Sequence, residues 1–174
     1  MDAASAGDTI EVRSGVYVEN VDVDKQLTLI GEGADVVTVR AADASDHVFN
    51  VTADWVNVSG FNATGAMTWK KMGIHLNSVN HCNISENNAS NNHHGIYIEY
   101  SKNTTLTSNI ANSNNGYGIL LSSSNNNTLE SNNVSNNGQG IHIDFSSNYN
   151  SHSARRSSNI ILFAFFPHQA QNIP

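Results

Sequence analysis

Four glycines recur in the middle of the chain, and the side chains that follow them are the ones best suited to chemistry. They are Gly73, Gly95, Gly118 and Gly140. Two places after each glycine the chain carries, in turn, His75, Tyr97, Leu120 and His142, and four places after it Asn77, Glu99, Ser122 and Asp144. Two carboxylates at a suitable separation hydrolyse glycosidic bonds, whereas aromatic rings and carboxylates bind sugars without cleaving them. The candidate catalytic pair is Glu99 and Asp144, and the candidates for carbohydrate binding are His75, Tyr97, Glu99, Tyr100, His142, Asp144 and Trp69.

These side chains need a scaffold that repeats with the glycines, which are 22, 23 and 22 residues apart. Such a period is typical of a solenoid, in which each repeat packs only on its neighbours. Apolar residues alternate over short runs, such as Ile96 and Ile98, and the turns between them are rich in Asn and Ser, which disfavour helix interiors. Three short strands with turns fill a coil of this size. The sequence therefore predicts an all-β fold, a single-stranded right-handed parallel β-helix with three faces and coils of about 22 residues.

Equal positions of successive coils must stack into columns about 4.8 Å apart. We expect Ile74, Ile96, Ile119 and Ile141 to form one column inside the coils. A recurring asparagine indicates an asparagine ladder at a turn, with these residues in the left-handed conformation that asparagine tolerates. The ladder residues are Asn87, Asn109 and Asn132.

The same spacing places Glu99 and Asp144 two coils apart, with their Cα atoms about 9–10 Å from each other. The carboxyl groups of inverting glycosidases are ~6.5–9.5 Å apart. Three interpretations of this face stay open: catalysis, sugar binding and a merely solvated surface. Trp69 lies in an inserted loop, residues 65–71, which either offers the ring to a ligand or folds it back over the coils.

The composition argues against several ligands. The net charge is −7 and no basic stripe is present, so nucleic-acid binding is disfavoured, and no apolar run is long enough to span a membrane. Adjacent His93 and His94 point apart in an extended segment, and His75 and His142 are three coils, or about 14 Å, apart. We therefore predict no metal and no other cofactor. The expected partner is a polysaccharide or cell-envelope glycan, and the open ends of the solenoid also suggest self-association.

Three phrases near the start of the chain carry a family resemblance: Gly7-Asp8-Thr9-Ile10, Ser14-Gly15-Val16-Tyr17 and Leu27-Thr28-Leu29-Ile30-Gly31. They resemble the first coil of right-handed parallel β-helix proteins of the pectin-lyase-like superfamily. The Asn-rich coils that follow are similar to the NosD-like group within it, and the resemblance covers residues 3–150. It implies a domain for carbohydrate binding or sugar hydrolysis, of the kind found in archaeal cell-surface proteins, or a copper-associated accessory protein.

The catalytic motifs of the superfamily's enzymes are missing. No arginine occurs between Arg40 and Arg155 to act as the base of a lyase, and the Gly-His-Gly phrase of polygalacturonases is absent. Our hypothesis is a non-catalytic β-helix protein, structural or carbohydrate-binding, that is extracellular or at the cell surface, or periplasmic if bacterial. The alternatives are a polysaccharide hydrolase or lyase and a copper-associated accessory protein. No signal peptide is recognisable in the chain.

The repeat pattern fails after Asn150, where the composition changes. We predict a β-helix domain over residues 1–150, interpreted as a fragment of a longer solenoid, and a non-repeat tail over residues 151–174. The tail contains an apolar run at residues 160–166 and either caps the last coil or is unrelated sequence. Asn-x-Ser/Thr sequons are candidate glycosylation sites in an exported protein, and they occur at Asn50, Asn57, Asn62, Asn83, Asn88, Asn103, Asn126 and Asn133.

Overall fold

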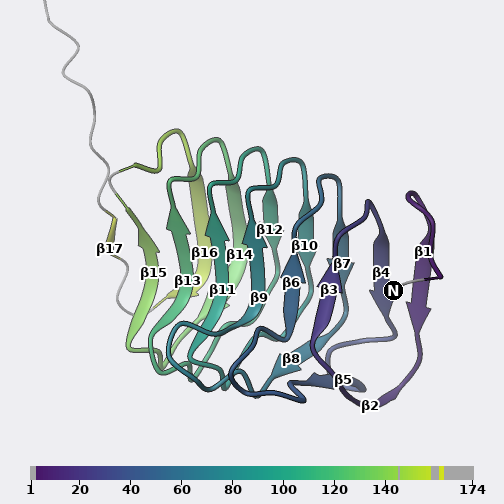
Figure 1. Ribbon diagram of the computed structural model, residues 1–174. Coiled ribbons are helices and arrows are strands. Elements are labelled where there is room, and N and C mark those ends of the chain that lie inside the picture. The colour runs from purple at the N-terminus through teal and green to yellow at the C-terminus, as the bar shows by residue number, and fades with distance from the viewer. Residues whose placement is uncertain (1–2, 145, 158–160, 163–174) are drawn as a thin grey trace, which may run out of the picture.

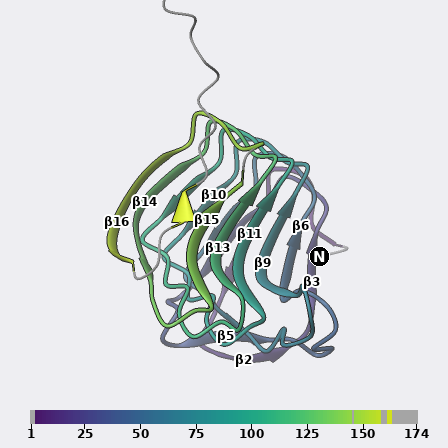
Figure 2. The ribbon, with the colours of Figure 1, turned by 90° about the vertical axis from the view of Figure 1, so that its left-hand side faces the viewer.

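The computed structural model describes residues 3–144, 146–157 and 161–162, and over these the chain winds into a right-handed parallel β-helix (Figure 1). Each strand pairs in parallel with the strands one coil before and one coil after it. A view from the side of the last coils shows the coils lying behind one another (Figure 2). The fold class predicted from the glycine period is confirmed.

Three sheets run along the solenoid and form its faces. The first contains β1 (Thr9–Val12), β4 (Thr28–Gly31), β7 (Asn57–Ser59), β10 (Asn83–Ser85), β12 (Thr105–Thr107), β14 (Thr128–Val134) and β16 (Ser151–Ser157). The second contains β3 (Val21–Val23), β6 (Phe49–Val51), β9 (Met72–Asn77), β11 (His94–Glu99), β13 (Tyr117–Ser122), β15 (Gln139–Ile143) and β17 (Ile161–Leu162). The third contains β2 (Gly15–Val18), β5 (Val37–Arg40) and β8 (Asn62–Thr64), and it continues through single bridges that join Asn62, Asn88, Ile110 and Asn133.

The interior of the coils is apolar because alternate side chains of each strand point inward. The predicted inward column of Ile74, Ile96, Ile119 and Ile141 is present, in register and fully buried. A large buried side chain of this kind contributes about 1.5–3 kcal/mol relative to an exposed one. The column therefore both fixes the register and stabilises the stack.

The predicted asparagine ladder is also present, but inside the solenoid. Asn109 Nδ2 donates to Asn132 Oδ1 at 3.0 Å and to the carbonyl of Ile84 at 2.8 Å, while Asn109 Oδ1 accepts the backbone N–H of Asn87 at 3.1 Å. The prediction that the asparagines themselves are left-handed is wrong. The left-handed residue is the one before each of them, for example Ser108 with φ 56°, and this turn points the asparagine amide into the core.

A second ladder recurs five residues after the first, at Asn92, Asn114 and Asn137. Asn114 Nδ2 donates to Asn137 Oδ1 at 3.0 Å and to the carbonyl of Ala89 at 3.2 Å. Both ladders thus satisfy backbone groups of turns that would otherwise be buried without partners.

Strand pairing continues beyond Asn150. Ser151 lies in β16 and pairs with Thr128 of β14, and β17 pairs with β15. Parallel strands therefore extend past the predicted domain boundary. Most of the apolar run at residues 160–166 lies outside the described residues. Within the part of the chain that the structure describes, no helix has the length and apolar character needed to cross a membrane.

Candidate functional site

The candidate residues lie on the second sheet, in two stacked columns. One column contains His75, Tyr97, Leu120 and His142, and the other contains Asn77, Glu99 and Ser122. Neighbouring members are one strand spacing apart, about 4.8 Å. The parallel register therefore brings residues from distant parts of the sequence onto one face.

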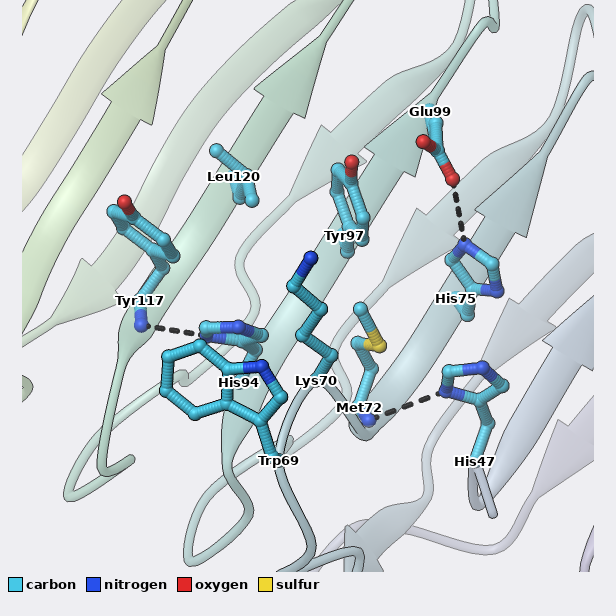
Figure 3. Close-up of a pocket in the computed structure, with 10 residues that line it drawn as sticks. All are labelled: His47, Trp69, Lys70, Met72, His75, His94, Tyr97, Glu99, Tyr117 and Leu120. Atoms are coloured by element: carbon cyan, nitrogen blue, oxygen red, sulfur yellow. Dashed lines mark hydrogen bonds and ion pairs between the residues drawn. The ribbon is translucent and has the colours of Figure 1, made fainter. Parts of the chain in front are cut away.

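A groove crosses this face over β9, β11 and β13, with a volume of about 480 Å³ (Figure 3). The loop of residues 65–71 forms one border and carries Trp69 and Lys70. Trp69 is 72% exposed, and its ring meets the His93 ring edge-on at 4.8 Å. The Trp69 ring therefore borders the groove with one edge against His93 and most of its surface exposed. The groove is lined by His47, Trp69, Lys70, Met72, His75, His94, Tyr97, Glu99, Tyr117 and Leu120.

His75 links several of these groups. Its Nε2 lies 3.6 Å from Glu99 Oε2, and its Nδ1 lies 3.2 Å from Asn50 Oδ1. The ring stacks with Tyr97 at 5.4 Å and lies 4.4 Å from the His47 ring. Burial lowers the pKa of His75, although the Glu99 carboxylate acts in the opposite direction. These contacts hold the imidazole in a fixed orientation beneath the groove.

The rings of His47 and His94 are each held by a hydrogen bond from the backbone. His47 Nδ1 accepts the backbone N–H of Met72 at 3.2 Å, and His94 Nδ1 accepts that of Tyr117 at 2.9 Å. Burial lowers the pKa of each imidazole to about 4, with nearby positive groups as a further cause. Both rings are neutral at pH 7, and because Nδ1 is an acceptor, the proton lies on Nε2.

Tyr97 stands at the centre of the groove (Figure 3). Burial is the main cause that raises its pKa to about 12, and the Glu99 carboxylate adds to the effect. The phenol therefore keeps its proton at neutral pH and offers an O–H donor beside an aromatic face.

Asp144 has a different role from Glu99. Its carboxylate accepts hydrogen bonds from the Ser122 and Ser147 hydroxyls and from the backbone N–H groups of Ser123 and Ser146. Burial alone would raise the pKa of Asp144, but these hydrogen bonds lower it below its usual value. A carboxylate with four donors closes a turn and has little capacity left to act as a base or nucleophile.

The structure thus separates the residues predicted for the site. Glu99, His75, Tyr97 and Trp69 line the groove, whereas Asp144, His142 and Tyr100 do not. His142 lies one strand beyond the groove, with its ring 5.1 Å from that of Tyr117, and Tyr100 is 60% exposed at the turn after β11. Sequence reasoning placed Leu120 in the outward column but not among the site candidates, and it missed His47, Lys70, Met72, His94 and Tyr117. A signal for three of them was available, because Met72, His94 and Tyr117 each stand directly before a repeat glycine.

The sequon asparagines differ in exposure. Asn83, Asn103 and Asn126 are exposed. The side chains of Asn57 and Asn62 are half-buried and donate to Thr28 and Thr38 of the preceding coil. The other three, Asn50, Asn88 and Asn133, are also half-buried. Glycosylation remains a prediction, and the exposed three are its best candidates.

A right-handed parallel β-helix of this kind is the fold of the pectin-lyase-like solenoids. Within that class, the chain belongs to the family described as periplasmic copper-binding protein (NosD), whose model matches residues 1–162. No curated protein sequence matches the chain.

Three solved structures share the fold at low identity. The catalytic domain of a GH87 alpha-1,3-glucanase, in complex with tetrasaccharides, has a TM-score of 0.62 at 12% identity, over 82% of this chain and 34% of that one. Geobacillus virus E2 ORF18 has a TM-score of 0.60 at 14% identity, over 86% of this chain and 41% of that one. A pectin methylesterase in complex with a hexasaccharide has a TM-score of 0.51 at 14% identity, over 87% of this chain and 60% of that one. The chain spans between about a third and three fifths of these structures, so the likeness shows the fold alone.

The copper named in the family description can be tested against the side chains of the groove. Copper sites need several His, Cys or Met ligands directed at one point. Both ring nitrogens of His75 face Asn50 or Glu99, and His47 Nδ1 is occupied by a backbone N–H. Over residues 3–144, 146–157 and 161–162, no three His, Cys, Asp or Glu side chains are grouped to hold a metal ion. The groove therefore holds no cluster of His, Cys, Asp or Glu side chains arranged for a copper ion among the described residues.

Proposed function

We propose that this chain is a non-catalytic, glycan-binding β-helix of an exported protein, periplasmic if its source is bacterial. The observation that carries the proposal is the groove over β9, β11 and β13. Its aromatic rings come from Trp69, Tyr97 and Tyr117, and hydrogen-bonding groups lie between them. Sugar rings bind to such surfaces by packing on aromatic faces and by hydrogen bonds to their hydroxyl groups. The open groove across neighbouring strands suits a linear polymer.

The state of the acids favours binding over hydrolysis. Asp144 is fully engaged in a turn and does not line the groove, so it is no second acid for Glu99. Hydrolysis by the usual mechanism needs two available carboxyl groups, one on each side of the scissile bond. The described groove contains a single carboxylate, that of Glu99.

The proposal is tested by binding and turnover measurements on the same protein. Affinity for a panel of soluble neutral and acidic polysaccharides is measured by affinity gel electrophoresis, and released reducing ends are measured after long incubation. We expect binding without release of product, and an affinity loss of about 3- to 10-fold for Tyr97→Ala and Trp69→Ala. Trp55→Ala is the matched control, because Trp55 is 55% exposed and lies outside the groove.

Two results would contradict the proposal. Release of reducing ends that Glu99→Gln abolishes would establish the enzyme alternative. Absence of both binding and turnover across the panel would leave a purely structural solenoid.

A further inference from the structure

A chain of hydrogen-bonding side chains crosses the strands of the second sheet and passes through His75. Asp22 of β3, Asn50 of β6 and His75 of β9 are neighbours in the parallel register. Asn50 Nδ2 donates to Asp22 Oδ1 at 3.0 Å, and His75 Nδ1 lies 3.2 Å from Asn50 Oδ1. On the other side of the ring, His75 Nε2 lies 3.6 Å from Glu99 Oε2. The chain therefore begins and ends at a carboxylate, with three gaps between its members.

The number of protons in this chain shows which gap lacks one. A carboxylate only accepts, whereas the Asn50 amide and a neutral imidazole each supply one proton along the chain. Two protons therefore serve three gaps. The gap between His75 Nε2 and Glu99 is the longest and exceeds hydrogen-bond distance, and Nε2 has no hydrogen-bond partner among the described residues. The proton of His75 thus lies on Nδ1, where Asn50 Oδ1 accepts it.

The other tautomer of His75 is disfavoured by Asn50 and Asp22. A proton on Nε2 would leave Nδ1 and Asn50 Oδ1 as two facing acceptors at 3.2 Å. Rotation of the Asn50 amide would relieve this contact only by directing Oδ1 at the Asp22 carboxylate, which lies 3.0 Å from the amide. His75 is 7% exposed, and an unsatisfied contact is costly at a buried position. The two residues therefore fix the tautomer of the ring.

His75 differs in this respect from the other two histidines that line the groove. His47 and His94 accept backbone N–H groups at Nδ1 and carry Nε2–H groups. His75 instead directs an unprotonated Nε2 toward Glu99, the only carboxylate among the residues that line the groove (Figure 3). The two residues that fix its tautomer do not line the groove themselves.

Resting on the proposed function, we infer that Asp22 and Asn50 are positioning residues of the groove. Their hydrogen bonds hold the proton of His75 on Nδ1, so that Nε2 and the Glu99 carboxylate form a pair of acceptors. This pair accepts hydrogen bonds from hydroxyl groups of the ligand, which supply the proton that the chain lacks. Asp22 and Asn50 act through His75 and do not touch the ligand.

The tautomer is measured by NMR of the full chain labelled with ¹⁵N at histidine, with the His75 signals assigned from His75→Gln. At pH 8 the ring is neutral, because burial lowers the pKa of His75, and the unprotonated nitrogen is recognised by its downfield shift. We expect this nitrogen to be Nε2 in the wild type and Nδ1 in Asn50→Leu, which removes the acceptor. Asn50→Asp still presents an oxygen to Nδ1 and should keep the wild-type tautomer.

The role of Asp22 is tested in the same way. Asp22→Ala frees the Asn50 amide to rotate, so we expect a mixture of the two tautomers of His75. Asp24→Ala is the matched control, because Asp24 is exposed directly after β3 and has no hydrogen bond among the described residues. The control should keep the wild-type tautomer.

The consequence for binding is measured by affinity gel electrophoresis on the same polysaccharide panel. Asn50→Leu should weaken the binding of each polysaccharide that the wild type binds by about 3- to 10-fold, the effect of one neutral hydrogen bond. Asn50→Asp and Asp24→Ala should bind as the wild type does.

Each other outcome has a distinct meaning. A wild-type His75 with its proton on Nε2, or an Asn50→Leu variant that keeps the wild-type tautomer, overturns the inference. A tautomer that switches without any change in affinity overturns the role of Asp22 and Asn50 in binding. No binding of any polysaccharide by the wild type contradicts the proposed function, while the NMR spectra still decide the tautomer. Should Asn50→Leu fail to fold, the spectra of the wild type and Asp22→Ala decide the inference.

Discussion

Replacing Asn109 by alanine tests whether the buried asparagine ladder holds the coils together. The Asn109 side chain is fully buried and makes four hydrogen bonds. It accepts from the backbone N–H and the side-chain amide of Asn87, and it donates to the Ile84 carbonyl and to Asn132 Oδ1. The substitution removes all four bonds.

The cost follows from the groups that lose their partners. Asn132 Oδ1 still accepts the backbone N–H of residue 109, and the Asn87 amide still donates to the Val58 carbonyl. The backbone N–H of Asn87 and the Ile84 carbonyl lose the side-chain partner that bonded them. A buried polar group left unsatisfied costs about 1–3 kcal/mol, so we expect a loss of about 2–6 kcal/mol in the free energy of unfolding. For a chain of this length, a loss of about 4 kcal/mol lowers the melting temperature by about 8–16 °C.

The measurement is thermal unfolding followed by the β-sheet circular dichroism signal. Asn83→Ala is the matched control, because Asn83 is exposed in β10, in the coil before that of Asn109, and its side chain has no hydrogen bond among the described residues. We expect the control to melt within about 2 °C of the wild type. If Asn109→Ala melts as the control does, the ladder does not stabilise the stack and the reasoning from buried hydrogen bonds is wrong.

The remaining predictions concern the core column and the buried histidines. Ile119→Asp should cost about 4 kcal/mol or more in urea unfolding because it buries an unpaired charge, whereas Leu120→Asp on the outward face should cost far less; equal losses would mean that the register is wrong. Acidification should also destabilise the protein, because His47 and His94 have pKa values of about 4 when folded and about 6.5 when unfolded. Between these pH values the unfolded chain binds more protons, so the free energy of unfolding falls as the pH drops from about 6.5 to about 4 and then levels off, by at most roughly 3 kcal/mol for each ring. If the double variant His47→Gln, His94→Gln lost as much free energy of unfolding over this pH range as the wild type, the two histidines would not be the cause.

Much of the fold was determined by the sequence alone. The glycine period required a solenoid, because no single coil can bury its own apolar face. The alternation of Ile96, Tyr97 and Ile98 fixed which side chains of one strand face inward and which face the groove, and parallel stacking then carried that pattern to the neighbouring coils. The inward isoleucine column and the column that contains Tyr97 are direct consequences. The asparagine ladder was also visible, although the sequence did not show whether its amides point in or out.

The composition of the groove was decided only by the tertiary structure. If side chains alternated strictly along β11, inward-facing Ile96 would be preceded by an outward-facing Gly95 and an inward-facing His94. The repeat glycines instead face the core, where a Cβ at Gly118 would collide with the side chains of Val134 and Asn137. The glycines are not among the paired residues: on β11, His94 pairs with Met72 and Ile96 pairs with Ile74 of β9. Each inward isoleucine is therefore preceded by a glycine that also faces inward. The residue before that glycine then lies on the outer face. His94 and its neighbours in that column therefore line the groove, together with the loop of Trp69 and Lys70, whose position depends on packing across coils rather than on any local pattern.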